Sequence, residues 1–345
     1  MIIISLLLSV IFLVACNGEK TSSKPKGKNK VIEASIEDAR FIVTSNTDSF
    51  DPEGNTGLIM INLNVKNKTK NSLDIFPEQN IVLFDDDIQI DAISVHDMSL
   101  DLDFLMNSSV GAEKQKIFPV AFEVERDKTY QIQIEPMTLD MDAEAVTLDI
   151  DMNDYSETYD GLNEPAEVLQ SFIETVYFAK EQEGLEELVN IDIEEQIEEA
   201  KKGYVKFLED ISFTDVPSKV AKNFYDDFIN ALNDKAEVDV KLKGNSGDKA
   251  VVEINYEMFS SLDLSDSFRD HRQKFLDQSK TFDVDGADEH AFSKLDIIFK
   301  EAKTRENSYP VEIYMSKQDG KWTLESKFSD PLKDLRDIFA EGRNY

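Results

Sequence analysis

Residues 58–75 read LIMINLNVKNKTKNSLDI, and this stretch decides the architecture of the first half of the chain. Apolar side chains recur at every second position from Ile59 to Val65, a period that is typical of a half-buried strand. Turn residues follow, and further short apolar runs come at residues 81–84, 120–124 and 130–134. Short strands at this spacing predict an antiparallel β-sandwich over residues 31–152.

The same stretch resembles the immunoglobulin-like, telokin-like extracellular domain of many Gram-positive lipoproteins. Gly57 leads into it, VLFDDD (82–87) supplies a strand and a turn, and GAEK (111–114) precedes the run IFPVAFEVERDKTYQIQIEP (117–136). The resemblance implies an immunoglobulin-like sandwich, in a group whose members mostly are uncharacterised or act as binding or adaptor modules. A sandwich by itself assigns no function.

The pattern changes at Asn163, after residues 153–162, which have the composition of a linker. Pro165 fits the first turn of a helix, and apolar residues then recur at three-four spacing. An α+β domain is therefore predicted over residues 163–345. Its further helices are expected at residues 185–208, after Pro217, at 264–278, at 287–303 and after Pro331, and its strands at 236–242, 249–258, 309–315 and 321–324.

Two features of this second half resemble known families. A helical first half followed by a DGKW hairpin (319–322) resembles the cone-shaped, nuclear-transport-factor-2-like α+β fold, and Gly320 suits the tight turn. The resemblance implies a concave sheet face, although the helices between the strands depart from the simple cone. A P-x-x-V-L-x-x-F-I opening helix resembles a Gram-positive lipoprotein family of unknown function, through Pro165, Val168, Leu169, Phe172 and Ile173.

Residues 1–15, MIIISLLLSVIFLVA, are almost wholly apolar, but they are fewer than the ~20 residues that a spanning helix needs. They match the apolar core of a secretory signal. The sequence Leu13-Val14-Ala15-Cys16 resembles a bacterial lipobox, which implies cleavage between Ala15 and Cys16, lipidation of the Cys16 thiol and an anchor on the extracytoplasmic face of the membrane. No Lys or Arg precedes Cys16, unlike most bacterial signals. The alternative is an N-terminal core strand that contains a Cys.

Residues 16–30 are expected to be the lipidated Cys followed by a flexible basic tether. The segment after Cys16, NGEKTSSKPKGKNK, has five lysines against Glu19, so it carries 5 − 1 = +4. Such a tether either faces anionic lipid or serves as a solvated spacer. The lysines are Lys20, Lys24, Lys26, Lys28 and Lys30.

Charge and cysteine content exclude several classes of function. The chain has 37 Lys and Arg against 70 Asp and Glu, a net charge of −33. Such a chain repels nucleic-acid phosphate, which excludes DNA and RNA as partners, and it favours cationic partners instead. A single Cys rules out a disulfide framework and a Cys-based zinc site.

Recognisable catalytic motifs are absent from the sequence, including serine-hydrolase elbows, HExxH helices and Gly-rich phosphate loops. Three histidines, His96, His271 and His290, lie in polar or charged stretches. We expect them to be solvated surface side chains. Because carboxylates occur throughout the chain, a catalytic pair cannot be selected from the sequence, and no catalytic residue is predicted.

Calcium is the one cofactor for which the sequence offers ligands, since it binds clustered carboxylate oxygens. No cluster has the twelve-residue spacing of a calcium loop, so a solvated turn is the favoured interpretation at each and no cofactor is predicted, with calcium as the alternative. The three clusters are Asp48, Asp51 and Glu53; Asp85, Asp86 and Asp87; and Asp283, Asp285, Asp288 and Glu289.

The sequence therefore predicts a lipid-anchored extracytoplasmic protein that acts as a non-enzymatic binding or interaction module at the cell surface. Its partners would be the membrane, through the anchor, and an unknown protein or small-molecule ligand, with a cationic one favoured. Two alternatives stay open. One is an envelope enzyme that uses a concave pocket of the second domain, and the other is a passive stress or immunity factor.

Overall fold

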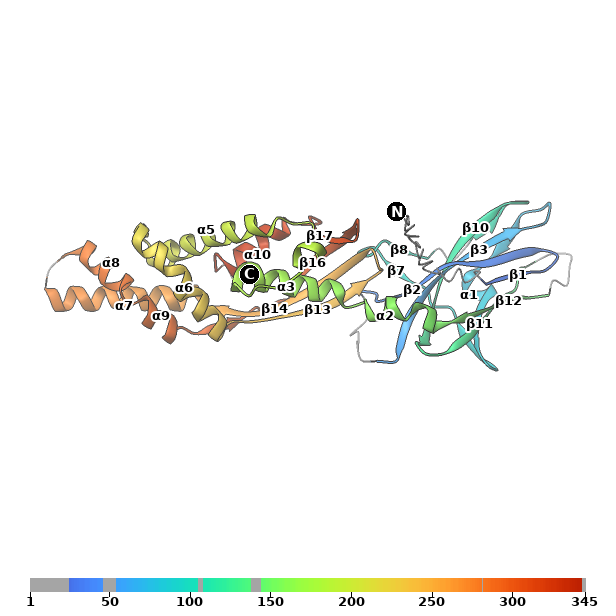
Figure 1. Cartoon of the computed structure of the whole chain (residues 1–345), viewed down its shortest axis with the longest axis horizontal. Helices are drawn as coiled ribbons and strands as arrows, with labels where there is room; N and C mark the ends of the chain where they lie inside the picture. Colours follow the sequence, from blue (N-terminus) through green and yellow to red (C-terminus); the bar gives the residue numbers. More distant parts are fainter. Residues whose placement is uncertain (1–24, 46–53, 105–107, 138–143, 281, 343–345) are drawn as a thin grey trace, which may run out of the picture.

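The computed structural model of this protein describes residues 25–45, 54–104, 108–137, 144–280 and 282–342. The molecule is elongated, with a sheet-rich N-terminal part at one end and an α+β part at the other (Figure 1). This arrangement confirms the expectation of a multidomain chain. The predicted cleavage and lipidation residues, Ala15 and Cys16, and the calcium candidates Asp48, Asp51 and Glu53 lie outside the described residues.

Two four-stranded antiparallel sheets dominate the N-terminal part. The first has the order β1 (Lys26–Lys28), β2 (Ile32–Ile42), β3 (Thr56–Asn67) and β10 (Gln115–Glu125). The second has the order β12 (Val146–Asp151), β11 (Thr129–Ile134), β5 (Ile81–Asp85) and β6 (Ile88–Asp91). Two short pairs and one short helix accompany them: β4 (Leu73–Ile75) with β9 (Ser108–Val110), β7 (His96–Asp97) with β8 (Leu102–Asp103), and α1 (Pro77–Asn80).

The two sheets share one hydrophobic core, to which residues 58–75 contribute as their alternation predicts. Ile59, Ile61, Leu63 and Val65 of β3 are all fully buried. They belong to one cluster with buried side chains of β5, β11 and β12. Because successive side chains of a strand point to opposite faces, Met60 lies on the other face of β3, where it joins a separate cluster.

The turn that ends this stretch is built around the buried side chain of Asn67. Its amide nitrogen donates to the carbonyl oxygens of Asn71 (2.8 Å) and Val110 (3.0 Å). Its amide oxygen accepts the main-chain N–H of Thr69 at 2.8 Å. A buried amide is tolerated when its hydrogen bonds are made, so Asn67 fixes the path from β3 to β4 and β9.

Residues 26–28, which the sequence places in a flexible tether, instead form the edge strand β1, antiparallel to β2. Gly27 makes this possible: a Cβ atom there would lie 2.7 Å from Val146 Cγ1 and 2.8 Å from the carbonyl oxygen of Thr147. The glycine therefore lets β1 approach the second sheet closely. Asn29 then turns the chain by accepting the N–H groups of Val31 and Ile32, each at 2.7 Å.

The expected linker, residues 153–162, is instead a packed segment, with the 3₁₀-helix η1 (Met152–Tyr155) and the helix α2 (Ser156–Asp160). The Tyr159 ring is buried and meets the Phe41 ring edge to face, with centroids 5.1 Å apart. Its hydroxyl donates to the carbonyl oxygen of Gly54 at 3.0 Å. The segment folds because its apolar side chains, Tyr159 and Leu162 included, complete the N-terminal core.

The second part is α+β, as the sequence predicts. Its antiparallel sheet has the order β13 (Glu237–Asn245), β14 (Lys249–Phe259), β16 (Val311–Gln318) and β17 (Lys321–Glu325), with β15 (Thr304–Glu306) also paired to β14. Its helices are α3 (Glu164–Phe178), α4 (Leu185–Leu188), α5 (Ile193–Ser212), α6 (Ser218–Lys235), α7 (Ser261–Ser279), α8 (Val284–Phe292), α9 (Leu295–Glu301) and α10 (Pro331–Phe339).

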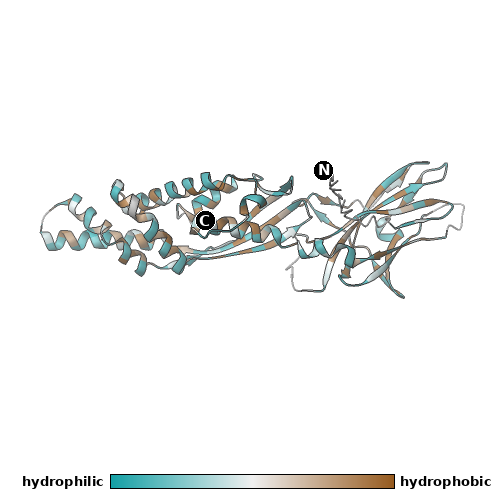
Figure 2. Ribbon diagram, in the orientation of Figure 1, coloured by the Kyte–Doolittle hydropathy of each residue, from teal (hydrophilic) through white to brown (hydrophobic). Residues whose placement is uncertain are grey.

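Helices cover one face of this sheet, and hydrophobic residues alternate with hydrophilic ones along helices and strands (Figure 2). Val252, Ile254 and Tyr256 of β14 are buried in the same cluster as Phe172 of α3 and Phe228 of α6. The intervening β14 side chains are partly exposed on the opposite face. The period-two pattern therefore places the core of this part between sheet and helices.

The helix predicted at residues 287–303 is broken into α8 and α9 at Ser293 and Lys294. The break lets both halves reach the core, since Phe292 meets Phe268 of α7 and Phe299 meets Phe224 of α6.

None of the described helices is long and apolar enough to cross a membrane.

The DGKW hairpin is hydrogen-bonded to the start of α3 through its tryptophan. Trp322 is buried, and its Nε1–H donates to Oε2 of Glu164 at 3.2 Å. The ammonium group of Lys317 pairs with the same oxygen at 2.5 Å. One carboxylate thus joins β16, β17 and α3, which agrees with a structural role for Trp322.

Candidate functional site

The two parts of the molecule are joined through main-chain hydrogen bonds at the end of β13. Val43, just after β2, donates its N–H to the carbonyl oxygen of Asn245 at 2.8 Å and accepts the Asn245 N–H at 2.7 Å. The buried side chain of Asn245 adds a bond from Nδ2 to the carbonyl oxygen of Leu162 at 2.8 Å. The N-terminal part therefore continues the edge of the C-terminal sheet.

A small apolar cluster packs behind this contact. Met60 of the first part and Val251 of β14 are both buried in it, together with Leu100. Gly244 allows the close approach, because a Cβ atom there would lie 2.9 Å from the main-chain nitrogen of Ser45. The junction is thus a packed contact between the two parts as well as a hydrogen-bonded one.

The loop between β7 and β8 is held at the junction by Asp97. This carboxylate is buried, and it accepts the main-chain N–H and the hydroxyl of Ser45, each at 2.6 Å, and the N–H of Ser99 at 2.9 Å. Asp101 then adopts a positive φ of 55°, a conformation that Asp tolerates better than most residues. The loop is positioned by these bonds over the C-terminal sheet.

Ion pairs cross the junction on both sides of the β13–β14 turn. Arg40 Nη1 lies 2.9 Å from Oδ2 of Asp248, and Lys249 Nζ lies 2.7 Å from Oδ2 of Asp101. All four side chains retain solvent contact, so these pairs contribute little stability. Their main effect is to orient the charged groups.

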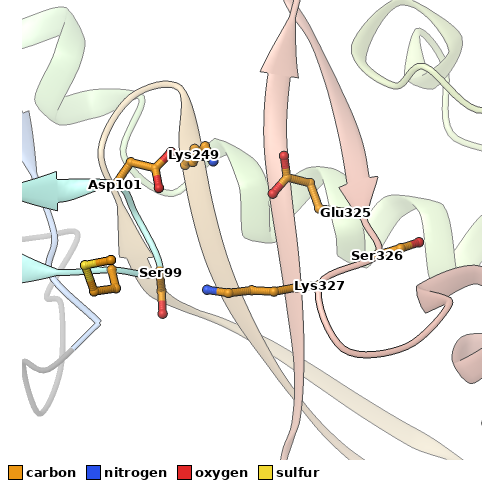
Figure 3. A pocket seen from close by; sticks show the side chains of 7 residues that line it. Ser99, Asp101, Lys249, Glu325, Ser326 and Lys327 are labelled. Atoms are coloured by element: carbon orange, nitrogen blue, oxygen red, sulfur yellow. Dashed lines mark ion pairs between the residues drawn. The ribbon is translucent and has the colours of Figure 1, made fainter.

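A cavity of ≈ 400 Å³ lies beside the second of these ion pairs (Figure 3). Both parts of the molecule contribute to it. Its lining consists of Met98, Ser99 and Asp101 from the first part and Lys249, Glu325, Ser326 and Lys327 from the second. In Figure 3 the side chain of Lys327 extends toward Ser99, and Asp101 faces Lys249.

The cavity presents charges of both signs. Hydrogen bonding between Asp101 and Lys249 lowers the pKa of the Asp101 carboxyl and raises the pKa of the Lys249 ammonium group. Both groups are therefore ionised at neutral pH. The ammonium group of Lys327 lies 4.3 Å from the ring centroid of Tyr314. Its contact there is with an aromatic face, so the group can still receive an anion.

The three histidines that the sequence singles out lie at two different places in the structure. His96 is an exposed residue of β7, with its Nδ1 3.2 Å from Oδ1 of Asp103. His271 of α7 and His290 of α8 face each other with ring centroids 6.5 Å apart. Burial, with the nearby Lys274 and His290, lowers the pKa of His271. The three side chains therefore do not form one site, and none of them lines the junction cavity.

Four of the described calcium candidates serve as a turn residue, a helix cap or ion-pair partners. Asp85 accepts Lys128 Nζ at 2.8 Å, and Asp86 has a positive φ of 52° in the β5–β6 turn. Asp283 caps α8 by accepting the N–H of Gly286, and Asp288 pairs with Arg272 at 2.5 Å. Within the described ranges, no group of three or more acidic, His or Cys side chains is placed to hold a metal ion.

One carboxylate is buried in the core of the α+β part. Asp337 of α10 pairs with Lys333 one turn earlier at 2.5 Å. Nearby, burial raises the pKa of the Tyr177 hydroxyl well above its usual value, so this phenol stays protonated. The Tyr204 hydroxyl donates to the carbonyl oxygen of Tyr177 at 2.8 Å. These groups lie inside the domain and not in a described cavity.

Sequence patterns did not single out the cavity residues. Met98, Asp101 and Lys327 lie outside the predicted elements, and Lys249 stands at the first position of a predicted strand, so none of them is marked as a site residue. The one signal in the sequence is the number of turn residues around positions 97–101 and 245–249. These residues predict two loops, but they do not indicate that the loops lie close together in space. The pairing depends on contacts between segments far apart in the chain, such as Arg40 with Asp248.

Comparison with known proteins finds a relative that aligns with this chain over nearly its whole length. The uncharacterized lipoprotein YcdA of Bacillus subtilis (strain 168) is 24% identical over 333 residues, which cover 93% of this chain and 92% of that protein. A crystal structure of YcdA from the same organism aligns with a TM-score of 0.71 at 21% identity, over 92% of this chain and 99% of that chain. This likeness shows a shared fold.

One family model matches more than half of the chain. It is described as a domain of unknown function, DUF5105, and it matches residues 155–339. The match begins in η1 and ends in α10, so it spans the sheet and helices of the α+β part. The protein belongs to the DUF5105 family.

Proposed function

We propose that this protein is a lipid-anchored lipoprotein on the extracytoplasmic face of the cell membrane, and that it binds a small zwitterionic ligand in the junction cavity without catalysing a reaction. The observation that carries the binding role is the cavity itself. It is formed between two packed parts, and its lining includes the lysines Lys249 and Lys327 and the carboxylates Asp101 and Glu325. Sites at domain interfaces are common places for ligands.

The anchor rests on the sequence Leu13-Val14-Ala15-Cys16 after an apolar segment. YcdA, which resembles this chain over nearly its whole length, is described as a lipoprotein. Two or three acyl chains on Cys16 would hold the protein stably, at about 0.8 kcal/mol for each buried CH₂. The tether before β1 would be residues 17–25, with the rest of the chain folded outside the membrane.

The finer fold assignments are part of the same proposal. We assign the N-terminal sheets to the immunoglobulin-like class, because two four-stranded antiparallel sheets enclose one core. We assign the second part to the cone-shaped, nuclear-transport-factor-2-like class, because helices cover one face of an antiparallel sheet. Both assignments are analogies of architecture and carry no function of their own.

The chemistry of the cavity suits a ligand with both an anionic and a cationic group. A carboxylate or phosphate would approach the Lys327 and Lys249 ammonium groups, which donate charge-assisted hydrogen bonds. An ammonium group would approach Glu325 or Asp101, and Met98 offers the ligand an apolar contact. A non-enzymatic role is favoured because the buried carboxylates Asp97 and Asp337 are already bonded to partners.

The binding role is tested by thermal unfolding of the purified chain with a panel of amino acids, short peptides and phosphate-bearing zwitterions. A ligand that binds the native state raises the unfolding midpoint, and the midpoint rises further as the ligand concentration increases. We expect the shift to disappear in a variant with Lys249→Ala and Lys327→Ala. It should persist in Lys219→Ala, which removes an exposed lysine of α6. A shift of equal size in all three proteins would refute this site.

The anchor is tested separately. Replacing Cys16 with Ala should release the protein from the membrane fraction and abolish incorporation of labelled fatty acid. Retention of the variant in membranes without acyl label would show that another segment holds it there. Because the two experiments use different variants, loss of the anchor and loss of binding can be distinguished.

A further inference from the structure

The sheet of the α+β part has two outer strands, β17 and β13. Their outer edges differ in the main-chain hydrogen bonds that they make to other segments. At the β17 edge, Val189 forms a bridge with Trp322, and Asn190 donates its N–H to the carbonyl oxygen of Trp322 at 2.9 Å. At the β13 edge, the contact with Val43 occupies only the end, at Asn245. In the described part of the chain, main-chain bonds to the outer edge of residues 237–242 are absent.

The hydrogen bonds of Tyr256 show which groups of β13 point outward. Tyr256 is paired with Val238 in the ladder, yet its carbonyl oxygen accepts the Asn307 N–H at 2.9 Å. Its N–H donates to Oδ1 of Asn307 at 2.8 Å. Both bonds lie on the side away from β13, so Val238 and Tyr256 are a non-hydrogen-bonded pair. Because ladder pairs alternate, the N–H and C=O groups of Val238, Val240 and Leu242 point to the open edge.

The side chains along this open edge have a symmetric order. Asp239 and Lys241 lie on the solvent face, where they are both exposed and paired with each other at 2.5 Å. Val238, Val240 and Leu242 lie on the face covered by helices and are only partly buried. This order is centred on Val240. The apolar residues Val238 and Leu242 stand two positions away on either side. Asp239 and Lys241, which carry opposite charges, stand one position away on either side.

We propose that β13 pairs with β13 of a second copy of this chain, antiparallel and centred on Val240. In this register the outward groups of Val240 bond those of the second Val240, and Val238 faces Leu242. On the solvent face each Asp239 faces a Lys241. The result is a two-fold symmetric interface that continues the sheet from one molecule into the other.

The charges select this register among the symmetric ones. The outward residues Val238, Val240 and Leu242 must pair with each other, and more than one such pair can form only when the two-fold axis passes near position 239, 240 or 241. An axis at Asp239 would place two carboxylates opposite each other, and an axis at Lys241 would do the same for two ammonium groups. Like charges at opposed positions destabilise a strand pair, and opposite charges stabilise it. The axis at Val240 is the one that avoids both repulsions.

The geometry also limits the length of the contact. Val43 already fills the edge at Asn245, and the β13–β14 ladder shifts register between Leu242 and Gly244. At the other end the strand begins directly after α6, which ends at Lys235. Strand β13 runs along the long axis of the molecule (Figure 1). An antiparallel pair would therefore direct the two N-terminal parts to opposite ends of the dimer.

Two charge variants and their mixture test this interface. With Asp239→Lys, each of the two charge pairs at the contact becomes lysine facing lysine, and with Lys241→Asp each becomes aspartate facing aspartate. Each variant alone should weaken self-association by about tenfold or more, because two attractive pairs become two repulsive ones. Mixed together, the two variants should form a one-to-one dimer. The double variant with Asp239→Lys and Lys241→Asp restores both attractive pairs and should dimerise like the natural chain.

The measurement is sedimentation velocity of the purified full chain in mild detergent, over a range of concentrations, with circular dichroism to show that each variant is folded. Both substituted side chains are exposed, so folding should be unchanged. Charge rescue in the mixture and in the double variant would support the proposal. A natural chain that stays monomeric would overturn the proposal. A monomer that binds an added basic peptide at this edge would overturn it as well. So would single variants that dimerise as well as the natural chain.

Discussion

Val43 and Asn245 exchange two main-chain hydrogen bonds, 2.8 and 2.7 Å long, across the junction between the two parts of the molecule. The contact extends the edge of the C-terminal sheet with a residue from the N-terminal part. Because the Asn245 side chain also bonds Leu162, one residue ties together β13, the end of β2 and the segment after α2. The junction cavity is lined by residues from the same two parts of the molecule.

Asn245→Ala is expected to destabilise the chain by about 1–3 kcal/mol, because it leaves buried main-chain groups without a partner. The lost bonds are those from Asn245 Nδ2 to Leu162 and from the Gly247 N–H to Asn245 Oδ1. Denaturant unfolding of the purified protein measures the change. Asn153→Ala is the matched control, since its amide is exposed, and a change within about 0.5 kcal/mol is expected there. Equal effects would argue against a special role for Asn245.

Gly27→Ala tests the edge strand β1. A Cβ atom would meet Val146 Cγ1 at 2.7 Å and the carbonyl oxygen of Thr147 at 2.8 Å. We expect a loss of about 1–3 kcal/mol, as for other overpacked sites. Gly111→Ala provides the comparison, because its nearest neighbour would lie at 3.5 Å. If both variants unfold at the same denaturant concentration, residues 26–28 behave as the flexible tether expected from composition.

Local patterns in the sequence predict much of this fold. The alternation at residues 59–65 gives β3 and its buried face, and the three-four spacing after Pro165 gives α3. Both signals depend on neighbours along the chain. The role of Gly27 depends instead on Val146, and that of Tyr159 on Phe41 and Gly54. Such partners are set by tertiary packing, so residues 26–28, which have the composition of a tether, and residues 153–162, which have the composition of a linker, proved to be folded.

The junction cavity is beyond sequence prediction for a related reason. Its charged residues stand in turns whose composition fits any solvated loop, and their meaning comes from the pairing of distant segments. Arg40 and Asp248, which pair across the junction, are 208 residues apart. Strand β13 is a similar case. The sequence shows its alternating charged residues, but it does not show that the strand lies at an open edge of the sheet.

Acid is expected to loosen the α7–α8 end of the molecule through His271. Burial, Lys274 and His290 lower the pKa of His271, with Lys294 acting in the same direction and Glu301 opposing it. The unfolded state therefore binds the proton more tightly, so stability falls as the pH drops through the ordinary histidine value near 6.5.

Hydrogen exchange measured between about pH 7.5 and about pH 5.5 checks this dependence. After correction for the intrinsic exchange rate, amides of α7 and α8 should lose more protection on acidification in the natural chain than in His271→Gln. Amides of β14 serve as the internal reference. Identical slopes for α7 in the two proteins would contradict the assignment.

The central claim is that the junction cavity holds a small ligand, and native mass spectrometry of the chain purified from its own membranes tests it most directly. We predict a small-molecule adduct on the natural chain and on Lys219→Ala, and its loss from the variant with Lys249→Ala and Lys327→Ala. An adduct retained equally by all three proteins, or found on none of them, would contradict the account.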